Sequence, residues 1–227
     1  MPVRRARRIA AAIAGALALL LVLAQLFLPG IAASRISDRV ARYGRVQSVH
    51  VSAWPAVKLL WGDADSVSLR AGSLRVNPAS AAKLAHEARG VAKLDASAAA
   101  ARLGPLQLSD VRLRKRGDQL TAQAFLSDSA LHAALPSGVE VRLLRSEAAR
   151  VEVSARGGLF GISTSLDAVV QPREGRLVAQ PRIFPLPAVA VTLFSDPRLY
   201  VEGVSASRAA PPGGVPGYRL SMRATLR

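Results

Sequence analysis

The chain has 227 residues, a net charge of +16 and no cysteine. The absence of cysteine excludes disulfide bonds, thiolate metal sites, a cysteine nucleophile and an N-terminal lipid-modified cysteine. Half of the residues are hydrophobic, enough for a sizeable core, but only 4% are aromatic, too few for the base-stacking surfaces that bind single-stranded nucleic acid. The basic excess therefore indicates an anionic partner other than nucleic acid, with an anionic membrane surface the most natural one.

An apolar run at Ile9–Leu28 predicts a membrane segment, and a basic leader of residues 1–8 precedes it. About 20 helical residues suffice to cross a hydrocarbon layer of about 30 Å. The length favours an uncleaved transmembrane anchor, and the alternative is a secretory signal cut after Ala33. The leader is expected in the cytoplasm, which places residues 34–227 outside it. The expected location is the cell membrane, or the envelope if the leader is cleaved.

The first half of this domain combines alternating strands with short helices. The expected elements are a helix at 34–43, a strand at 46–51, a hairpin at 64–76 that turns at 71–73, and a helix at 77–89. Asn77 predicts the cap of that last helix, with Pro78 in its first turn. The run of alanines in Leu94–Leu103 favours a helix, whereas its position between strands favours a strand, which is the interpretation adopted.

The second half predicts a succession of strands. A hairpin is expected over 106–126, with a basic turn at 114–118, and a short helix follows from Ser127 or Asp128 to Ala134. The further strands are expected at 139–144, 150–155, 161–170, 176–183, 189–193, 199–204 and 218–226, with turns at 156–158 and 173–175. This order predicts an α+β fold with mostly antiparallel strands.

Recognisable catalytic motifs are missing from the sequence. His50, His86 and His132 are scattered, and none of them forms the His-Glu-x-x-His pattern of a zinc protease. Gly161–Ser165 lacks the final glycine of a nucleophile elbow. We therefore expect a protein that is not an enzyme and needs neither metal nor cofactor. A hydrolase or transferase of envelope glycolipids would require carboxylates or histidines that meet only in the folded chain.

Two groups of residues are candidates for lipid contact. The membrane-contact candidates are Trp54, Pro55, Val57, Lys58, Leu60 and Trp61, because tryptophans seven residues apart share one face of a helix and favour the membrane interface. The alternative places both indole rings in the core. The headgroup candidates are Arg112, Arg114, Lys115 and Arg116, which the alternative interprets as a solvated hairpin tip.

The segment Val49–Gly62, with the following Ala64–Leu69, resembles the opening of the actinobacterial LmeA-like phospholipid-binding proteins. The order of strand, Arg112–Gly117, strand, short helix and Leu135-Pro136 is similar to that family as well. The resemblance covers residues 34–227. It implies a curved antiparallel sheet wrapped around a helix, as in tubular lipid-binding proteins, with space for acyl chains. It also implies binding of anionic phospholipid in the cell envelope, and it supplies no catalytic residues.

The function expected from the sequence is therefore non-enzymatic binding or carriage of anionic phospholipid, with acyl chains in an apolar groove. The alternative is a structural envelope protein whose basic surface holds acidic polymers or a protein partner. The sequence predicts neither the lipid nor the oligomeric state.

Overall fold

The computed structural model describes residues 22, 24, 25, 27–147, 149–159, 162–182, 190–210 and 214–227. The predicted leader and most of the apolar run lie outside these residues. In the described part of the chain, no helix is both long enough and apolar enough to span a membrane.

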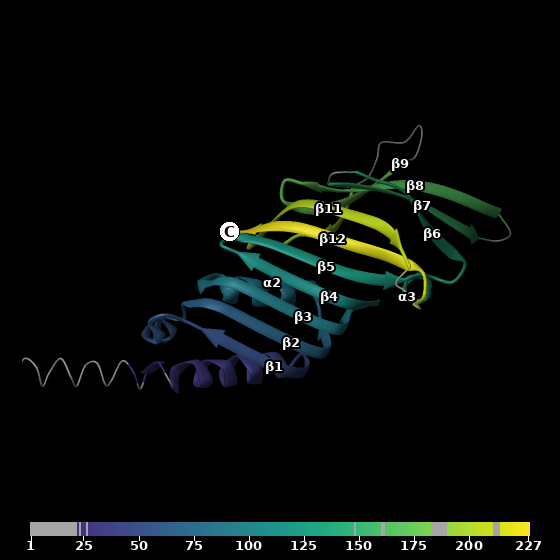
Figure 1. The fold of residues 1–227 in the computed structure, drawn as a ribbon. Coiled ribbons are helices and arrows are strands. Elements are labelled where there is room, and N and C mark those ends of the chain that lie inside the picture. Colours follow the sequence, from purple (N-terminus) through teal and green to yellow (C-terminus); the bar gives the residue numbers. More distant parts are fainter. Residues whose placement is uncertain are drawn as a thin grey trace, which may run out of the picture.

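A sheet of seven strands in the order β1-β2-β3-β4-β5-β12-β11 forms the larger part of the molecule (Figure 1). Its strands are β1 Gly44–Ser52, β2 Ala64–Val76, β3 Val91–Leu103, β4 Leu106–Arg116, β5 Gln119–Ser127, β11 Leu199–Ala209 and β12 Gly217–Leu226. Only β2 and β3 pair in parallel. A parallel pair needs a long crossover connection, and the helix α2 (Pro78–Glu87) with the short turn η2 (Ala88–Gly90) supplies it.

A second sheet lies beyond β11 and gives the molecule its elongated shape (Figure 1). Its five antiparallel strands follow the order β10-β9-β8-β7-β6, with bounds β6 Val139–Glu147, β7 Arg150–Leu159, β8 Ile162–Arg173, β9 Arg176–Arg182 and β10 Val191–Phe194. The helix α3 (Asp128–Ala134) leads from β5 to β6. The two sheets are joined at β11, where the Val201 N–H donates to the Gly175 carbonyl at 2.9 Å and the Ala206 N–H donates to Ser146 Oγ at 3.0 Å.

The N-terminal helix, described at residues 22, 24, 25 and 27–41, lies along one face of the first sheet, which we call the inner face (Figure 1). Ala32, Ala33 and Ile36 pack against a buried cluster of Val51, Ala64, Val67, Val91 and Leu94. The prediction that a new helix begins at Ser34 is wrong, because the helix continues through Pro29 and Gly30. Proline removes one helical hydrogen bond, and the packing of the following turns against the sheet offsets that loss.

Two predicted turns are absent as well. The expected hairpin at 64–76 is the single strand β2, in which the register to β1 shifts near Gly72. Pairing with β3 along the whole strand keeps it extended, and the extra residue is accommodated as a bulge. The expected turn at 156–158 lies inside β7, because Gly157 and Gly158 pair with Thr164 and Ser163 of β8.

The other predictions of local structure hold where they fall on described residues; Gly161, Ile183 and Val189, at the ends of three predicted strands, lie outside them. The Ser80 N–H donates to Asn77 Oδ1 at 2.7 Å, which confirms the predicted cap of α2. The alanine-rich segment is the strand β3, and β4 and β5 form the predicted hairpin. The turn between β8 and β9 requires glycine, because Gly175 has φ +78° and an added Cβ would lie 2.3 Å from the Tyr200 ring. The α+β, mostly antiparallel fold is therefore confirmed.

Candidate functional site

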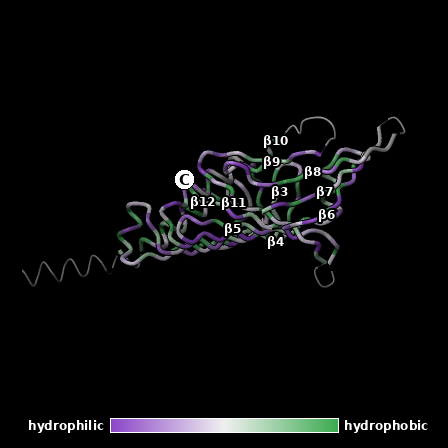
Figure 2. Tube along the Cα trace, turned by 90° about the horizontal axis from the view of Figure 1, so that it is seen from above, coloured by the Kyte–Doolittle hydropathy of each residue, from purple (hydrophilic) through white to green (hydrophobic). Residues whose placement is uncertain are grey.

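A row of apolar side chains crosses the inner face of the first sheet, and each member pairs in register with the next. Residues that pair in register point to the same face of a sheet. All members are half-buried, so the row is neither core nor open surface. We call it the apolar strip; its residues are Leu69, Ala96, Leu113, Ala122, Met222 and Val204. Figure 2 shows the alternation of apolar and polar residues along the strands from which it arises.

The apolar strip runs beside two buried clusters on the same face of the sheet. One cluster lies under the N-terminal helix, and the other contains Leu120, Leu199, Ala224 and Leu226 and is covered in part by Phe194 of β10. Leu113 contacts both clusters. The N-terminal helix therefore covers the start of the inner face, the second sheet contacts its far end at β11, and the half-buried strip crosses the face from β2 to β11.

Gln25, the polar residue near the end of the predicted membrane segment, binds the tryptophan segment, which we define as residues 53–62. Its Nε2 donates to the Ala53 carbonyl at 3.1 Å, and its Oε1 accepts from the Ala56 N–H at 2.8 Å. The two hydrogen bonds bracket Trp54 and Pro55. Ala53 and Ala56 are buried, at 3% and 1% exposure, so the base of the segment is fixed while its outer residues extend into solvent.

The tryptophan segment presents its large side chains to solvent. Trp54 and Trp61 are each 72% exposed and Leu60 is 66% exposed, which excludes the alternative that the indole rings form part of the core. Residues 56–61 form the predicted turn of helix, here a 3₁₀ turn, and Gly62 ends it with φ +85°. Lys58 Nζ lies 3.6 Å from Asp65 Oδ1, and the Trp54 N–H donates to the other oxygen of Asp65. Asp65 thus holds the segment together with Gln25.

The first described turns of the N-terminal helix, which Gln25 joins to this segment, carry further exposed apolar side chains. We call the combined group the apolar tip; its residues are Val22, Phe27, Ile31, Trp54, Leu60 and Trp61, each more than half exposed. One turn beyond Ile31, the exposed face of the helix becomes charged with Arg35, Asp38 and Arg39. An exposed apolar cluster with a charged border is typical of a protein or membrane interaction site.

The four headgroup candidates do not form one surface. Arg112, Arg114 and Arg116 are exposed on the outer face of β4, opposite the N-terminal helix, and Asp95 pairs with Arg114 at 3.6 Å and with Arg116 at 2.8 Å. Lys115 points to the inner face and is 1% exposed. Its ammonium donates to the carbonyls of Arg89 and Val91, and burial lowers its pKa. Lys115 therefore holds the η2 turn and cannot contact a headgroup in this conformation.

The comparisons with known proteins agree with these features. A family model described as LmeA-like phospholipid-binding matches residues 23–213. The chain belongs to the LmeA-like phospholipid-binding family. No curated protein and no solved structure matches the chain. The LmeA-like match begins just before Gln25 and includes the tryptophan segment and all strands of the apolar strip except β12.

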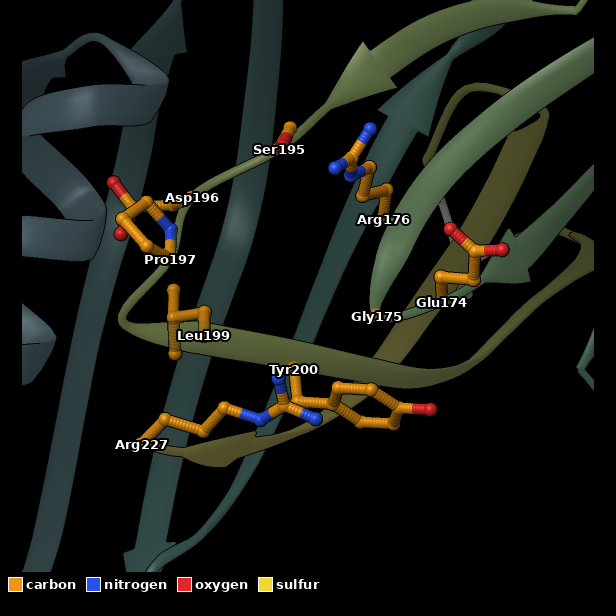
Figure 3. A pocket seen from close by; sticks show the side chains of 9 residues that line it. All are labelled: Glu174, Gly175, Arg176, Ser195, Asp196, Pro197, Leu199, Tyr200 and Arg227. Carbon is orange, nitrogen blue, oxygen red and sulfur yellow. The ribbon is translucent and has the colours of Figure 1, made fainter.

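A pocket of about 340 Å³ lies beside the start of β11, away from the apolar strip (Figure 3). Glu174 and Arg176 line it from the β8–β9 turn, and Asp196, Tyr200 and Arg227 line it from the other side. The Arg227 guanidinium stacks on the Tyr200 ring at 4.2 Å. This lining of mixed charge does not match an acyl chain, so we do not assign the phospholipid of an LmeA-like protein to it.

Sequence reasoning did not find the apolar strip or the role of Gln25. The sequence contained a signal for the strip, because apolar residues alternate along β3, β4 and β5. Only the register between strands, however, shows which of these residues align. Gln25 is unusual as a polar residue in an apolar run, yet its partners are about 30 residues away. Among the described residues, no three His, Asp or Glu side chains are placed to hold a metal ion.

Proposed function

We propose that this LmeA-like protein binds anionic phospholipid without catalysis and holds an acyl chain against the apolar strip. The observation that carries this proposal is the row of half-buried apolar side chains that crosses the inner face from β2 to β11. A helix lying along the inner face of a mostly antiparallel sheet supports the interpretation as a tubular lipid-binding-like fold.

The dimensions of the apolar strip suit an acyl chain. Six strands spaced about 4.8 Å apart give a row about 24 Å long. One leaflet of a bilayer is half of a hydrocarbon core of about 30 Å, so an acyl chain needs about 15 Å. Alanine at two of the six positions leaves room above the sheet that larger side chains would fill, since interiors are otherwise close-packed.

The apolar tip would place the protein at the membrane. Its indole rings favour the interface between hydrocarbon and headgroups, and the predicted membrane segment runs into the same end of the molecule. Arg35 and Lys58 border the tip, and we propose that they contact lipid phosphate in place of Lys115. The location at the cell membrane, with the domain outside the cytoplasm, is part of this proposal.

The proposal is tested by filling the strip. The Ala122→Trp substitution places an indole in the middle of the row, and Gln123→Trp places the same group on the outer face of the same strand. After purification of the full chain in a non-ionic detergent, the phospholipid retained per protein is quantified by mass spectrometry. We expect Ala122→Trp to lose most of the bound lipid and Gln123→Trp to keep it.

Both variants are checked for folding by thermal unfolding, and Ala122→Met provides a smaller filling group if the tryptophan disrupts the sheet. We expect the methionine variant to retain an intermediate amount of lipid. Equal amounts of lipid on wild type, Ala122→Trp and Gln123→Trp would exclude the strip as the acyl site.

A further inference from the structure

The outer face of the first sheet carries exposed arginines that the lipid site does not use. They lie on β2, β3, β4 and β12, and no carboxylate lies within ion-pair distance of them in the part of the chain that the structure describes. We call this surface the arginine face; its residues are Arg70, Arg75, Arg102, Arg112, Arg219 and Arg223.

Register places these arginines in regular positions. Arg70 pairs with Ser97 of β3, which pairs with Arg112 of β4, so the backbone positions of the two arginines lie two strands apart, about 9.6 Å by strand spacing. Arg75 and Arg102 are direct partners on the parallel strands β2 and β3. Like charges directly opposite each other destabilise a sheet, so a bound anion would relieve this repulsion.

Polar uncharged side chains fill several positions between the arginines, and the Asp95 carboxylate, paired with Arg114 and Arg116, occupies another position on this face. The row that contains Arg70 and Arg112 continues through Gln123 and Ser221, and Thr121 lies between Arg114 and Arg223. Guanidinium groups bind carboxylates and phosphates through paired hydrogen bonds, while hydroxyl and amide groups can donate to and accept from sugar hydroxyls. This alternation matches the chemistry of an acidic polysaccharide.

A bilayer fits this face less well. Of the large apolar side chains that are more than half exposed in the described residues, none lies on these four strands. The face is on the side of the sheet opposite the N-terminal helix and its apolar tip. We propose that the arginine face binds a linear acidic polysaccharide, independently of the phospholipid on the inner face.

The test uses fluorescently labelled alginate, a linear polyuronate, with the full chain in non-ionic detergent and neutral dextran as the control polymer. The variant Arg70→Gln with Arg112→Gln removes two charges from the arginine face. The matched control, Arg156→Gln with Arg173→Gln, removes two exposed arginines of the second sheet and has the same net charge as the first variant. We expect the first variant to weaken alginate binding about tenfold and the control to change it less than about threefold.

Three further readouts complete the test. We expect no binding of dextran, and alginate binding that falls with added salt because the contacts are exposed. We expect the Arg70→Gln, Arg112→Gln variant to retain as much phospholipid as wild type, which separates this proposal from the lipid site. Equal losses in the two double variants would show that net charge alone attracts the polymer, and would overturn the proposal. It would also fail if the chain bound phosphatidylglycerol vesicles through these arginines and did not bind alginate.

Discussion

At the scale of single residues, Lys115 shows how an inner-face position of an apolar row can hold a charge. Its neighbours in register are Leu94 and Leu120, and its ammonium is satisfied by two backbone carbonyls. A buried donor of this kind stabilises a particular turn rather than a ligand site. The basic run around the β4–β5 turn therefore divides into exposed arginines and one structural lysine.

Replacing Lys115 by methionine should lower the free energy of unfolding by about 1–3 kcal/mol at neutral pH, because the carbonyls of Arg89 and Val91 lose their donor. Burial lowers the pKa of Lys115 from 10.5. Between that lowered pKa and 10.5, the unfolded chain binds a proton that the folded chain releases, so this lysine makes stability rise with pH. Denaturant unfolding should show that the difference in free energy of unfolding between wild type and variant widens as the pH approaches 10.5. A difference that narrows over this pH range would contradict the assignment of Lys115 as a buried structural lysine.

At the scale of elements, the N-terminal helix has two chemically different faces. Ile36 packs on the sheet, whereas Ile31, just over one turn earlier, is 52% exposed. The helix thus joins the predicted membrane segment to the folded domain without a break in the described residues. The same element has a structural role on one face and a proposed membrane role on the other.

Alanine substitution at Ile36 and at Ile31 should separate the structural role of the helix from its proposed membrane role. Ile36→Ala should lower the free energy of unfolding by about 2 kcal/mol through lost packing, and Ile31→Ala should leave it nearly unchanged. The two tryptophans of the chain both lie in the tip, so their quenching by phosphatidylglycerol brominated on the acyl chains reports contact of the tip with lipid. Ile31→Ala should weaken that quenching and Ile36→Ala should not. The reverse pattern would show that Ile31 is structural and that the tip does not enter the membrane.

The elements themselves were largely predictable, because strand alternation, the Asn77 cap and Gly62 are local signals. The errors in turn prediction arose where pairing between strands overrides a local turn signal. Gly72 marks a bulge rather than a turn because β3 pairs along all of β2, and Gly157 and Gly158 remain in a strand because β8 pairs with them. Trp54 and Trp61 were found from sequence, but their exposure depends on how Gln25 and Asp65 hold the segment.

At the scale of the whole molecule, three surfaces have different chemistry. The apolar tip lies at the end that holds the tryptophan segment, the apolar strip lies on the inner face, and the arginines lie on the outer face of the same sheet. Much of the positive charge behind the net +16 therefore lies away from the proposed lipid site. The alternation along each strand separates an apolar from a cationic face, and this separation would allow lipid and polymer to bind together.

The central claim is that an acyl chain lies on the inner face, and photo-crosslinking tests it most directly. The full chain is incubated with vesicles that contain phosphatidylglycerol with a diazirine near the end of one acyl chain, then irradiated, digested and analysed by mass spectrometry. The proposed site predicts labelling of Leu113, Ala122 and Met222 on β4, β5 and β12. Labelling confined to the N-terminal helix and the tryptophan segment would contradict it, because the protein would then touch the bilayer without taking up its lipid.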